Sequence, residues 1–154
     1  MKRSEINNII LEANEMIKSF GHHLPDFAYW SVEKFREKQE EAKEIIRAGC
    51  GWDITDYGKG NFQTTGLFLF TLRNGKLADL ESGKGMCYSE KLLISRRDQV
   101  APMHTHIKKV EDIINRGGAN LAVEIFGSDP HGNYDNKKGG IVFCDGIERS
   151  FSPG

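Results

Sequence analysis

Three side chains in the second half of the sequence have the types and spacing of a metal site: His104, His106 and Glu111. On an extended strand, histidines two residues apart present their imidazoles on the same face. Glu111 follows five residues after His106, far enough for a short turn to bring its carboxylate back. Two neutral imidazoles and one carboxylate suit Zn²⁺, Mn²⁺ or Fe²⁺ and leave coordination positions open for a substrate. The pattern therefore favours a catalytic metal over a closed structural one.

The alternative interpretation is a pair of ordinary surface histidines on an exposed strand face. A bare His-x-His pattern does not separate the two interpretations, but Glu111 and the following Gly117-Gly118, which can turn the chain, favour the metal site. The pattern His-x-His-x4-Glu-x6-Gly, from His104 to Gly118, resembles the first metal motif of the cupin superfamily. One difference is that Asp98 stands where such motifs usually have a glycine, six residues before the first histidine.

Length and composition predict one soluble domain. The chain has 154 residues, a net charge of −1 and a pI near 6.5, which is enough length for a real core. This charge gives no electrostatic basis for binding nucleic acid or an anionic membrane. No apolar run approaches the roughly 20 residues of a membrane span, and the N-terminus leads into an amphipathic helix, so we expect a cytoplasmic protein.

The three cysteines are widely spaced and form no Cys-x-x-Cys pair. An odd number of separated cysteines predicts reduced thiols rather than a disulfide framework.

The first third of the chain reads as helical. Apolar residues recur at helical spacing over residues 4–20, with Ser4 as the expected N-cap and Gly21 as the stop. Ser31 is expected to cap a second helix that runs to about Ala48, with Val32 and Ile46 among its inward residues.

After the turn-rich segment 51–58, the apolar pattern changes to alternation and short runs, which are typical of strands. Strands are expected at 66–73, 87–95, 99–106, 110–115, 119–126, 140–144 and 147–151. Asn74-Gly75 and Asp145-Gly146 are strong signals for two-residue hairpins. Two helices followed by many short strands predict an α+β fold, mainly β, with helices packed on an antiparallel barrel or sandwich.

Several stretches together resemble the D-lyxose isomerase family more specifically than the metal motif does. They are residues 1–7 (MKRSEIN), 51–56 (GWDITD), 69–75 (LFTLRNG), 88–91 (YSEK) and 111–118 (EDIINRGG). The resemblance covers nearly the whole chain. It implies a single domain, 1–154, with an N-terminal helical segment, 1–50, and a cupin β-barrel portion, 51–154.

The resemblance also implies an activity: a metal-dependent aldose–ketose isomerase that interconverts D-lyxose and D-xylulose, with D-mannose and D-fructose as secondary substrates. It implies a divalent metal, Mn²⁺ first and Zn²⁺, Co²⁺ or Fe²⁺ as alternatives, and a homodimer. His104, His106 and Glu111 match the metal ligands of the family. Lys91 matches a lysine in the strand before the metal motif.

Two further residues are candidates for the chemistry of such a reaction. Lys91 is the candidate for polarising or protonating a substrate oxygen, and its alternative interpretation is a surface lysine on a strand. Glu124 shares the polar side of the expected strand 119–126 with Asn120, so it could act as a base or sugar ligand.

The C-terminus differs from the family pattern. A cupin has a second motif, roughly Pro-Gly-x-x-His, whose histidine is the fourth ligand, and this sequence has no match to it before Gly154. We therefore expect an incomplete barrel with an open sheet edge: a truncated product, a remainder supplied by another chain, or closure through a partner. The rival functions are a truncated or degenerate cupin that binds metal or sugar without turnover, and another metal-cupin enzyme such as an Fe²⁺ oxygenase.

Overall fold

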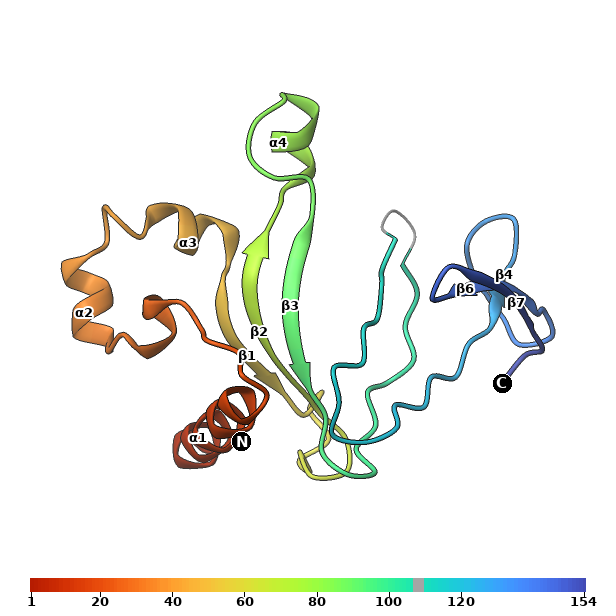
Figure 1. The fold of residues 1–154 in the computed structure, drawn as a ribbon, viewed down its shortest axis with the longest axis horizontal. Helices are drawn as coiled ribbons and strands as arrows, with labels where there is room; N and C mark the ends of the chain where they lie inside the picture. The colour runs from red at the N-terminus through yellow and green to blue at the C-terminus, as the bar shows by residue number, and fades with distance from the viewer. Residues whose placement is uncertain (107–109) are drawn as a thin grey trace. The chain divides into compact units, whose positions relative to one another are not determined.

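The computed structural model describes residues 1–106 and 110–154. The chain forms two compact units, Met1–Pro102 and Met103–Gly154, and each is described by itself. The elements of the first unit are α1 (Arg3–Ser19), a 3-10 helix η1 (Asp26–Tyr29), α2 (Val32–Glu37), α3 (Lys43–Ala48), β1 (Gly51–Thr55), β2 (Leu67–Asn74), α4 (Leu77–Glu81) and β3 (Ser89–Ile94) (Figure 1).

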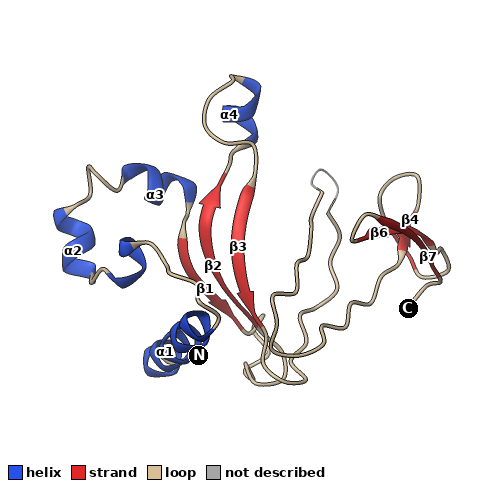
Figure 2. Cartoon of the chain, in the orientation of Figure 1, coloured by secondary structure: helices blue, strands red, loops and turns tan. Residues whose placement is uncertain are grey.

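The sheet of the first unit is antiparallel, with the strand order β1-β2-β3 (Figure 2). Trp52 of β1 lies opposite Phe70 of β2, which lies opposite Leu92 of β3. Because side chains alternate along a strand, these three residues share one face of the sheet. The other face carries the residues of opposite parity, including Leu69 and its partner Leu93.

The core lies between the first of these faces and the segments that contain α1 and η1. Ile9, Ala13 and Ile17 form the buried stripe of α1, and they pack in two clusters that contain Phe68 and Phe70. Their spacing of four residues places them on one side of the helix. The prediction of a core-facing helix at 4–20 is therefore confirmed.

The ends of α1 follow the local sequence. The backbone N–H of Lys2 donates to the Glu5 carboxylate, so Lys2 rather than the predicted Ser4 is the N-cap residue. Glu5 also places negative charge near the positive end of the helix dipole. The predicted stop at Gly21 is confirmed, because Gly21 has a φ of 73°, a left-handed conformation that glycine adopts without strain.

The prediction of one helix from Ser31 to Ala48 is wrong. Two short helices, α2 and α3, are separated by turns. The predicted cap is confirmed, since the Lys34 N–H donates to the Ser31 hydroxyl at 3.2 Å. Val32 and Ile46, expected inward, have exposed fractions of 60% and 55%. The buried side chain is Ala42, at 0% exposure, which holds the connection between the helices inward.

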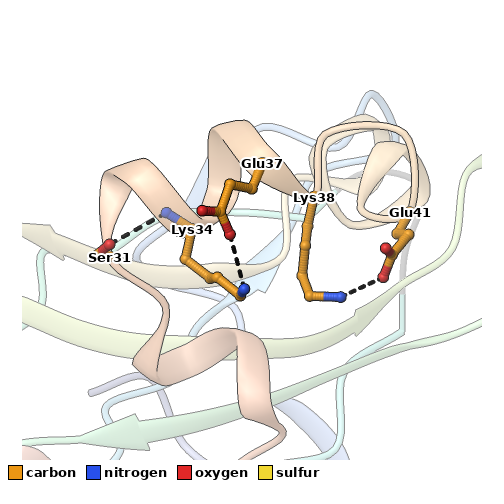
Figure 3. Close-up of polar contacts among 5 residues, drawn as sticks. All are labelled: Ser31, Lys34, Glu37, Lys38 and Glu41. Carbon is orange, nitrogen blue, oxygen red and sulfur yellow. Dashed lines mark hydrogen bonds and ion pairs between the residues drawn. The ribbon is translucent and has the colours of Figure 1, made fainter.

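Charge pairing accompanies this break. A continuous helix would align Glu37 with Glu41, a like-charge pair that disfavours it. In the structure Lys34 pairs with Glu37 at 2.8 Å and Lys38 pairs with Glu41 at 2.5 Å (Figure 3). Each carboxylate thus has a lysine three residues before it.

The strand predictions are confirmed for segments that pair with a second strand. β2, β3, β6 (Gly140–Cys144) and β7 (Ile147–Phe151) lie within two residues of their predicted ranges. The segment 51–58, read as turns, instead begins with strand β1. Trp52 and Ile54 alternate with polar residues and pack against the core. This alternation is typical of a strand, but the surrounding aspartates and glycines favoured a prediction of turns.

The two hairpin predictions have opposite outcomes. Asp145 and Gly146 have φ values of 51° and 78° and connect β6 to β7, as a turn with two left-handed residues requires. The Asn74-Gly75 prediction is wrong: Asn74 is the last residue of β2, and α4 intervenes before β3.

The second unit contains two small antiparallel sheets. One pairs β4 (Gly127–Ser128) with β5 (Tyr134–Asp135), and the other pairs β6 with β7. Strands predicted at 99–106, 110–115 and 119–126 are absent from the described residues of these segments (Figure 2). Residues 107–109 of the expected strand–turn region lie outside the described residues. Alternation of side chains predicts an extended chain, but a strand also needs a partner for its backbone hydrogen bonds.

The predicted α+β class is confirmed, with antiparallel sheets throughout the described residues. The described sheets do not close into a barrel, since their orders are β1-β2-β3, β4-β5 and β6-β7. The cupin barrel therefore remains a prediction. No helix in the described residues is long and apolar enough to span a membrane.

Candidate metal centre

The second unit brings His104, His106 and Glu111 together. The Nε2 atom of His106 lies 3.1 Å from Nε2 of His104 and 3.0 Å from Oε2 of Glu111. One ligand atom from each residue lies within 4.8 Å of the other two. The sequence-predicted ligands thus converge on a common centre.

The positions of these atoms fit the chemistry of a divalent ion. Ligands about 2.1 Å from an ion and about 90° to 109° apart around it are separated by roughly 3.0–3.4 Å. The separations of 3.1 Å and 3.0 Å from His106 match this range. A single imidazole nitrogen offers either one proton or one lone pair, yet His106 Nε2 faces two groups. The three side chains are therefore placed as ligands of one shared divalent ion would be.

The site is open to solvent within its unit. The side chains of His106 and Glu111 are 27% and 45% exposed, and the two imidazole rings meet edge to face at 4.6 Å between centroids. Three ligands with exposed side chains leave room for water or substrate oxygens to complete the coordination of an ion. This openness is typical of catalytic sites rather than structural ones.

A turn after Glu111 fixes the segment that carries it. The Gly117 N–H donates to the Asn115 side-chain oxygen at 3.0 Å, and the Asn115 side-chain amide donates to the Ala119 carbonyl at 2.9 Å. Gly117 and Gly118 have φ values of 133° and 97°, which side-chain-bearing residues rarely adopt. The interpretation of Gly117-Gly118 as the point where the chain turns agrees with this geometry.

Lys91 lies on β3 in the first unit, opposite Thr71 of β2. Its neighbours Leu92 and Ile94 pack on the core clusters, so Lys91 belongs to the sheet face that does not carry those clusters. Lys91 is exposed. Its position is described within the first unit alone, and its role toward a substrate remains a prediction.

Glu124 is exposed and lies on the segment 119–126, which has no ladder partner among the described residues. It is not a member of the His104, His106 and Glu111 cluster. The Gly154 N–H donates to the carbonyl of the adjacent Ile125 at 3.2 Å, so the end of the chain runs beside this segment. The structure therefore does not bring Glu124 to the ligands, and its catalytic role also remains a prediction.

Sequence reasoning did not identify the network around Asp129 in the loop between β4 and β5. The Asn133 side-chain amide and backbone N–H both donate to the Asp129 carboxylate, as does the His131 N–H. Hydrogen bonds from Asn133, foremost, hold the pKa of Asp129 below its usual value. Each acceptor is used within the loop, so this network organises a turn.

Comparison with models of known protein families gives a match over all 154 residues. A family model described as D-lyxose isomerase matches residues 1–154. The chain belongs to the D-lyxose isomerase family. The resemblance inferred from the sequence motifs is thereby confirmed.

Two relatives in this family have curated names. The chain is 45% identical over 134 residues to the D-lyxose/D-mannose isomerase of Escherichia coli O157:H7. It is 42% identical over 130 residues to the D-lyxose/D-mannose isomerase of Serratia proteamaculans. Each comparison covers 84% of this chain and 56% of the relative. The chain thus spans about half the length of the curated relatives that it matches.

Proposed function

We propose that this chain carries the metal-binding part of a D-lyxose isomerase that interconverts D-lyxose and D-xylulose, with D-mannose and D-fructose as further substrates. The observation that carries the proposal is the convergence of His104, His106 and Glu111 within 4.8 Å in a chain that belongs to this family. Both relatives are named D-lyxose/D-mannose isomerase, which supports D-lyxose and D-mannose as substrates.

The ligand set defines the cofactor of the proposal. His104, His106 and Glu111 would hold a divalent ion, Mn²⁺ first, with Zn²⁺, Co²⁺ or Fe²⁺ as alternatives, because mixed imidazole and carboxylate ligands suit all four. When bound, such an ion acts as a Lewis acid that polarises substrate oxygens and orients the sugar.

In the proposal, side chains carry out the proton transfers of the reaction. Aldose–ketose isomerisation transfers a proton from C2 to C1 through an enediolate and moves a second proton between O1 and O2, so it needs a base and a proton donor near the oxygens. In the proposal the ammonium group of Lys91 stabilises or protonates a substrate oxygen. The Glu124 carboxylate is the candidate within this chain for a base or sugar ligand.

The proposal includes a homodimer. In the second unit, β6 and β7 form an isolated two-stranded sheet, which is marginally stable alone, and Ile141, Phe143 and Ile147 on it are exposed. Apolar residues on strands whose outer edges have no partner among the described residues favour association with another chain. Light scattering of the purified protein measures this directly, and a monomer at micromolar concentration would contradict it.

The test of the proposed activity is conversion of D-lyxose by the 154-residue protein after addition of Mn²⁺, with bound metal measured on the same sample. Formation of D-xylulose that is lost on chelation and restored by Mn²⁺ would support the proposal. Bound metal without turnover would instead support a metal- or sugar-binding cupin without isomerase activity. Failure to bind any of the four ions would contradict the metal site itself.

A further inference from the structure

The face of the sheet on which Lys91 lies depends on the register between β2 and β3. Lys91 pairs with Thr71, and Leu92 pairs with Phe70. Because side chains alternate strictly along a strand, a slip of one residue would move Lys91 to the opposite face. The interactions that fix this register therefore decide where the Lys91 ammonium group lies.

The apolar pattern of β3 contributes to this register. Leu92 and Ile94 pack against the core clusters, while Leu93 lies on the other face with 59% of its surface exposed. Three consecutive apolar residues offer a leucine or isoleucine to either face. After a one-residue slip, Leu93 would replace both Leu92 and Ile94 on the inner face and Lys91 would lie beside it, so hydrophobic burial favours the observed register.

Polar contacts at the start of β3 add to this preference. The Ser89 hydroxyl donates to the Asn74 side-chain oxygen at 2.6 Å. The Asn74 side-chain amide donates to the carbonyl of Ala48, at the end of α3, at 2.7 Å. Asn74 thus joins three elements: β2, β3 and α3. One residue further, the Gly75 N–H donates to the Tyr88 carbonyl at 2.9 Å.

Gly75 is itself required by this arrangement. A Cβ atom at position 75 would lie 2.3 Å from the Met86 carbonyl oxygen and 3.0 Å from that of Tyr88. The Asn74-Gly75 pair, which resembled a hairpin turn in the sequence, instead anchors one end of the β2–β3 ladder.

A bulge and an ion pair lie between this anchor and Lys91. The register shifts between Thr71 and Arg73, so that Arg73 pairs with Glu90 while Thr71 pairs with Lys91. The extra residue is Leu72, and such a bulge changes the side to which the following side chain points. Arg73 Nε lies 3.4 Å from the Glu90 carboxylate.

The bulge separates two positive charges. Leu72 and Arg73 line the same surface cavity as Leu24 and Phe27, on the side of the sheet that carries the core. In a regular ladder Arg73 would share the face of Thr71 and Lys91. With the bulge, Lys91 is the only lysine or arginine of β1, β2 and β3 on its face.

We propose that Asn74, Ser89 and the Arg73–Glu90 pair form a register lock that positions Lys91. The lock holds β3 in the one register that places the ammonium group on the face opposite the helices, apart from Arg73. These are positioning residues, since they act through the strand and not on a substrate. The catalytic consequence rests on the proposed function, whereas the register itself does not.

The lock is tested with the double variant Asn74→Ala/Glu90→Ala, which removes three polar contacts: the Ser89–Asn74 and Asn74–Ala48 hydrogen bonds and the Arg73–Glu90 ion pair. The milder Ser89→Ala removes the Ser89–Asn74 hydrogen bond alone and retains the Asn74–Ala48 bond. Ser89→Thr keeps a hydroxyl and is the rescue variant. The matched control is Tyr29→Phe/Glu15→Ala, which removes the Tyr29–Asn14 hydrogen bond of 3.1 Å and the Lys18–Glu15 ion pair of 3.0 Å away from the ladder.

The direct readout is the set of cross-strand nuclear Overhauser contacts between β2 and β3 in the 154-residue protein. We expect the wild type, Ser89→Thr and the control to show the Leu69–Leu93 and Phe70–Leu92 pairing. The double variant is expected to show a second set of contacts shifted by one residue, and Ser89→Ala a smaller second set. A single native set in the double variant and in Ser89→Ala would overturn the lock. If the double variant does not fold, Ser89→Ala and its rescue by threonine decide the question.

Turnover of D-lyxose with Mn²⁺ tests the link to Lys91. We expect turnover per metal-loaded protein to fall in proportion to the shifted fraction, with metal occupancy unchanged. A shifted fraction with undiminished turnover would overturn the positioning of Lys91 as a catalytic requirement. If the metal-loaded wild type does not convert D-lyxose, the proposed function fails while the contacts still decide whether the lock exists.

Discussion

The indole N–H of Trp52 donates a hydrogen bond to the carbonyl oxygen of Ala28, 2.9 Å away. This contact joins β1 to η1 across 24 residues of sequence. The same indole packs edge to face on Phe70, with 4.6 Å between ring centroids. Trp52 therefore joins β1 to η1 by a hydrogen bond and packs on Phe70 of the neighbouring strand β2.

Replacing this residue tests the contribution of that contact. Trp52→Phe keeps an aromatic ring but leaves the Ala28 carbonyl without its donor, so we expect a loss of about 1–3 kcal/mol in the free energy of unfolding. Urea denaturation followed by circular dichroism measures it. Trp30→Phe is the control, because Trp30 contacts Phe35 through its ring. A Trp52→Phe protein no less stable than the control would refute the role of the bond.

Local sequence predicts local structure here where the signal and its partner lie close together. Residues 4–20 form a helix because its apolar stripe and glycine stop lie within the segment itself. Asp145-Gly146 connects two adjacent strands. Asn74-Gly75 has the same local character, but the Asn74 side chain bonds to Ala48, 26 residues away. A pattern within one segment of the sequence does not reveal a partner so far away along the chain.

A second prediction concerns Asp98, which stands at the usual glycine position of the cupin metal motif. Asp98 has a φ of 56°, in a turn where the Arg96 N–H donates to the Gln99 side-chain oxygen at 3.0 Å. Aspartate tolerates this left-handed conformation, and a β-branched residue does not. The glycine preference of the motif thus corresponds to a backbone requirement that Asp98 meets.

The expected order of stability is Asp98→Gly at least equal to wild type, and Asp98→Val lower by about 1–2 kcal/mol. The contact between the Asp98 and Arg97 side chains, 3.6 Å apart and 92% and 95% exposed, contributes little. Thermal unfolding of the three proteins checks the order. A valine variant as stable as wild type would show that the turn adapts.

The pairing of Arg47 with Asp79 makes part of the fold sensitive to acid. Arg47 Nη2 lies 2.8 Å from the Asp79 carboxylate and joins α3 to α4. Its hydrogen bond, foremost, holds the pKa of Asp79 below the ordinary value of 3.8. A carboxyl whose pKa is depressed by folding contributes stability above its unfolded pKa, and that contribution is lost as the pH falls through the folded value.

The contribution of this pair should therefore be full above about pH 5 and should decline below about pH 4. We expect Asp79→Asn to be less stable than wild type at pH 7 and to approach it as the pH falls through the lowered pKa of Asp79. Amide hydrogen exchange of α4 at several pH values isolates the local effect. Glu81→Gln is the control for loss of a negative charge in the same helix. A difference between Asp79→Asn and wild type that does not change with pH would contradict the pairing.

The metal site gives a prediction that is independent of turnover. His104→Ala removes one of three converging ligands, so we expect Mn²⁺ affinity to fall by more than the roughly 10–100-fold typical of losing an outer-shell partner. Circular dichroism should be unchanged, because His104 is exposed and its loss leaves no cavity in the core. Calorimetric titration of Mn²⁺ measures the affinity, with His131→Ala as the control. Equal affinity in both variants would exclude His104 as a ligand.

The convergence of three side chains in the second unit could be predicted from the sequence because their geometry is local. His104, His106 and Glu111 span eight residues, and alternation plus one turn suffices to bring them together. Lys91 and Glu124 lack such a short link to these three residues. Parity assigned Lys91 to a face of β3 but gave no distance, and the strand that would have given Glu124 a face is absent from the described residues. For Lys91 that face depends in turn on the ladder contacts of Asn74, Ser89 and Glu90, which no local pattern indicates.

The last prediction separates the role of Lys91 from that of the ligands. Lys91→Met keeps the length of the side chain and removes its charge, so a group that acts on a substrate oxygen is lost while the ligand set is intact. We expect turnover of D-lyxose to fall about 10²-fold or more, with Mn²⁺ occupancy within twofold of wild type. Lys59→Met, in the loop after β1, is the control for loss of a lysine. A Lys91→Met protein that loses metal and activity together would assign Lys91 to the metal site, and one with full activity would leave it a surface lysine.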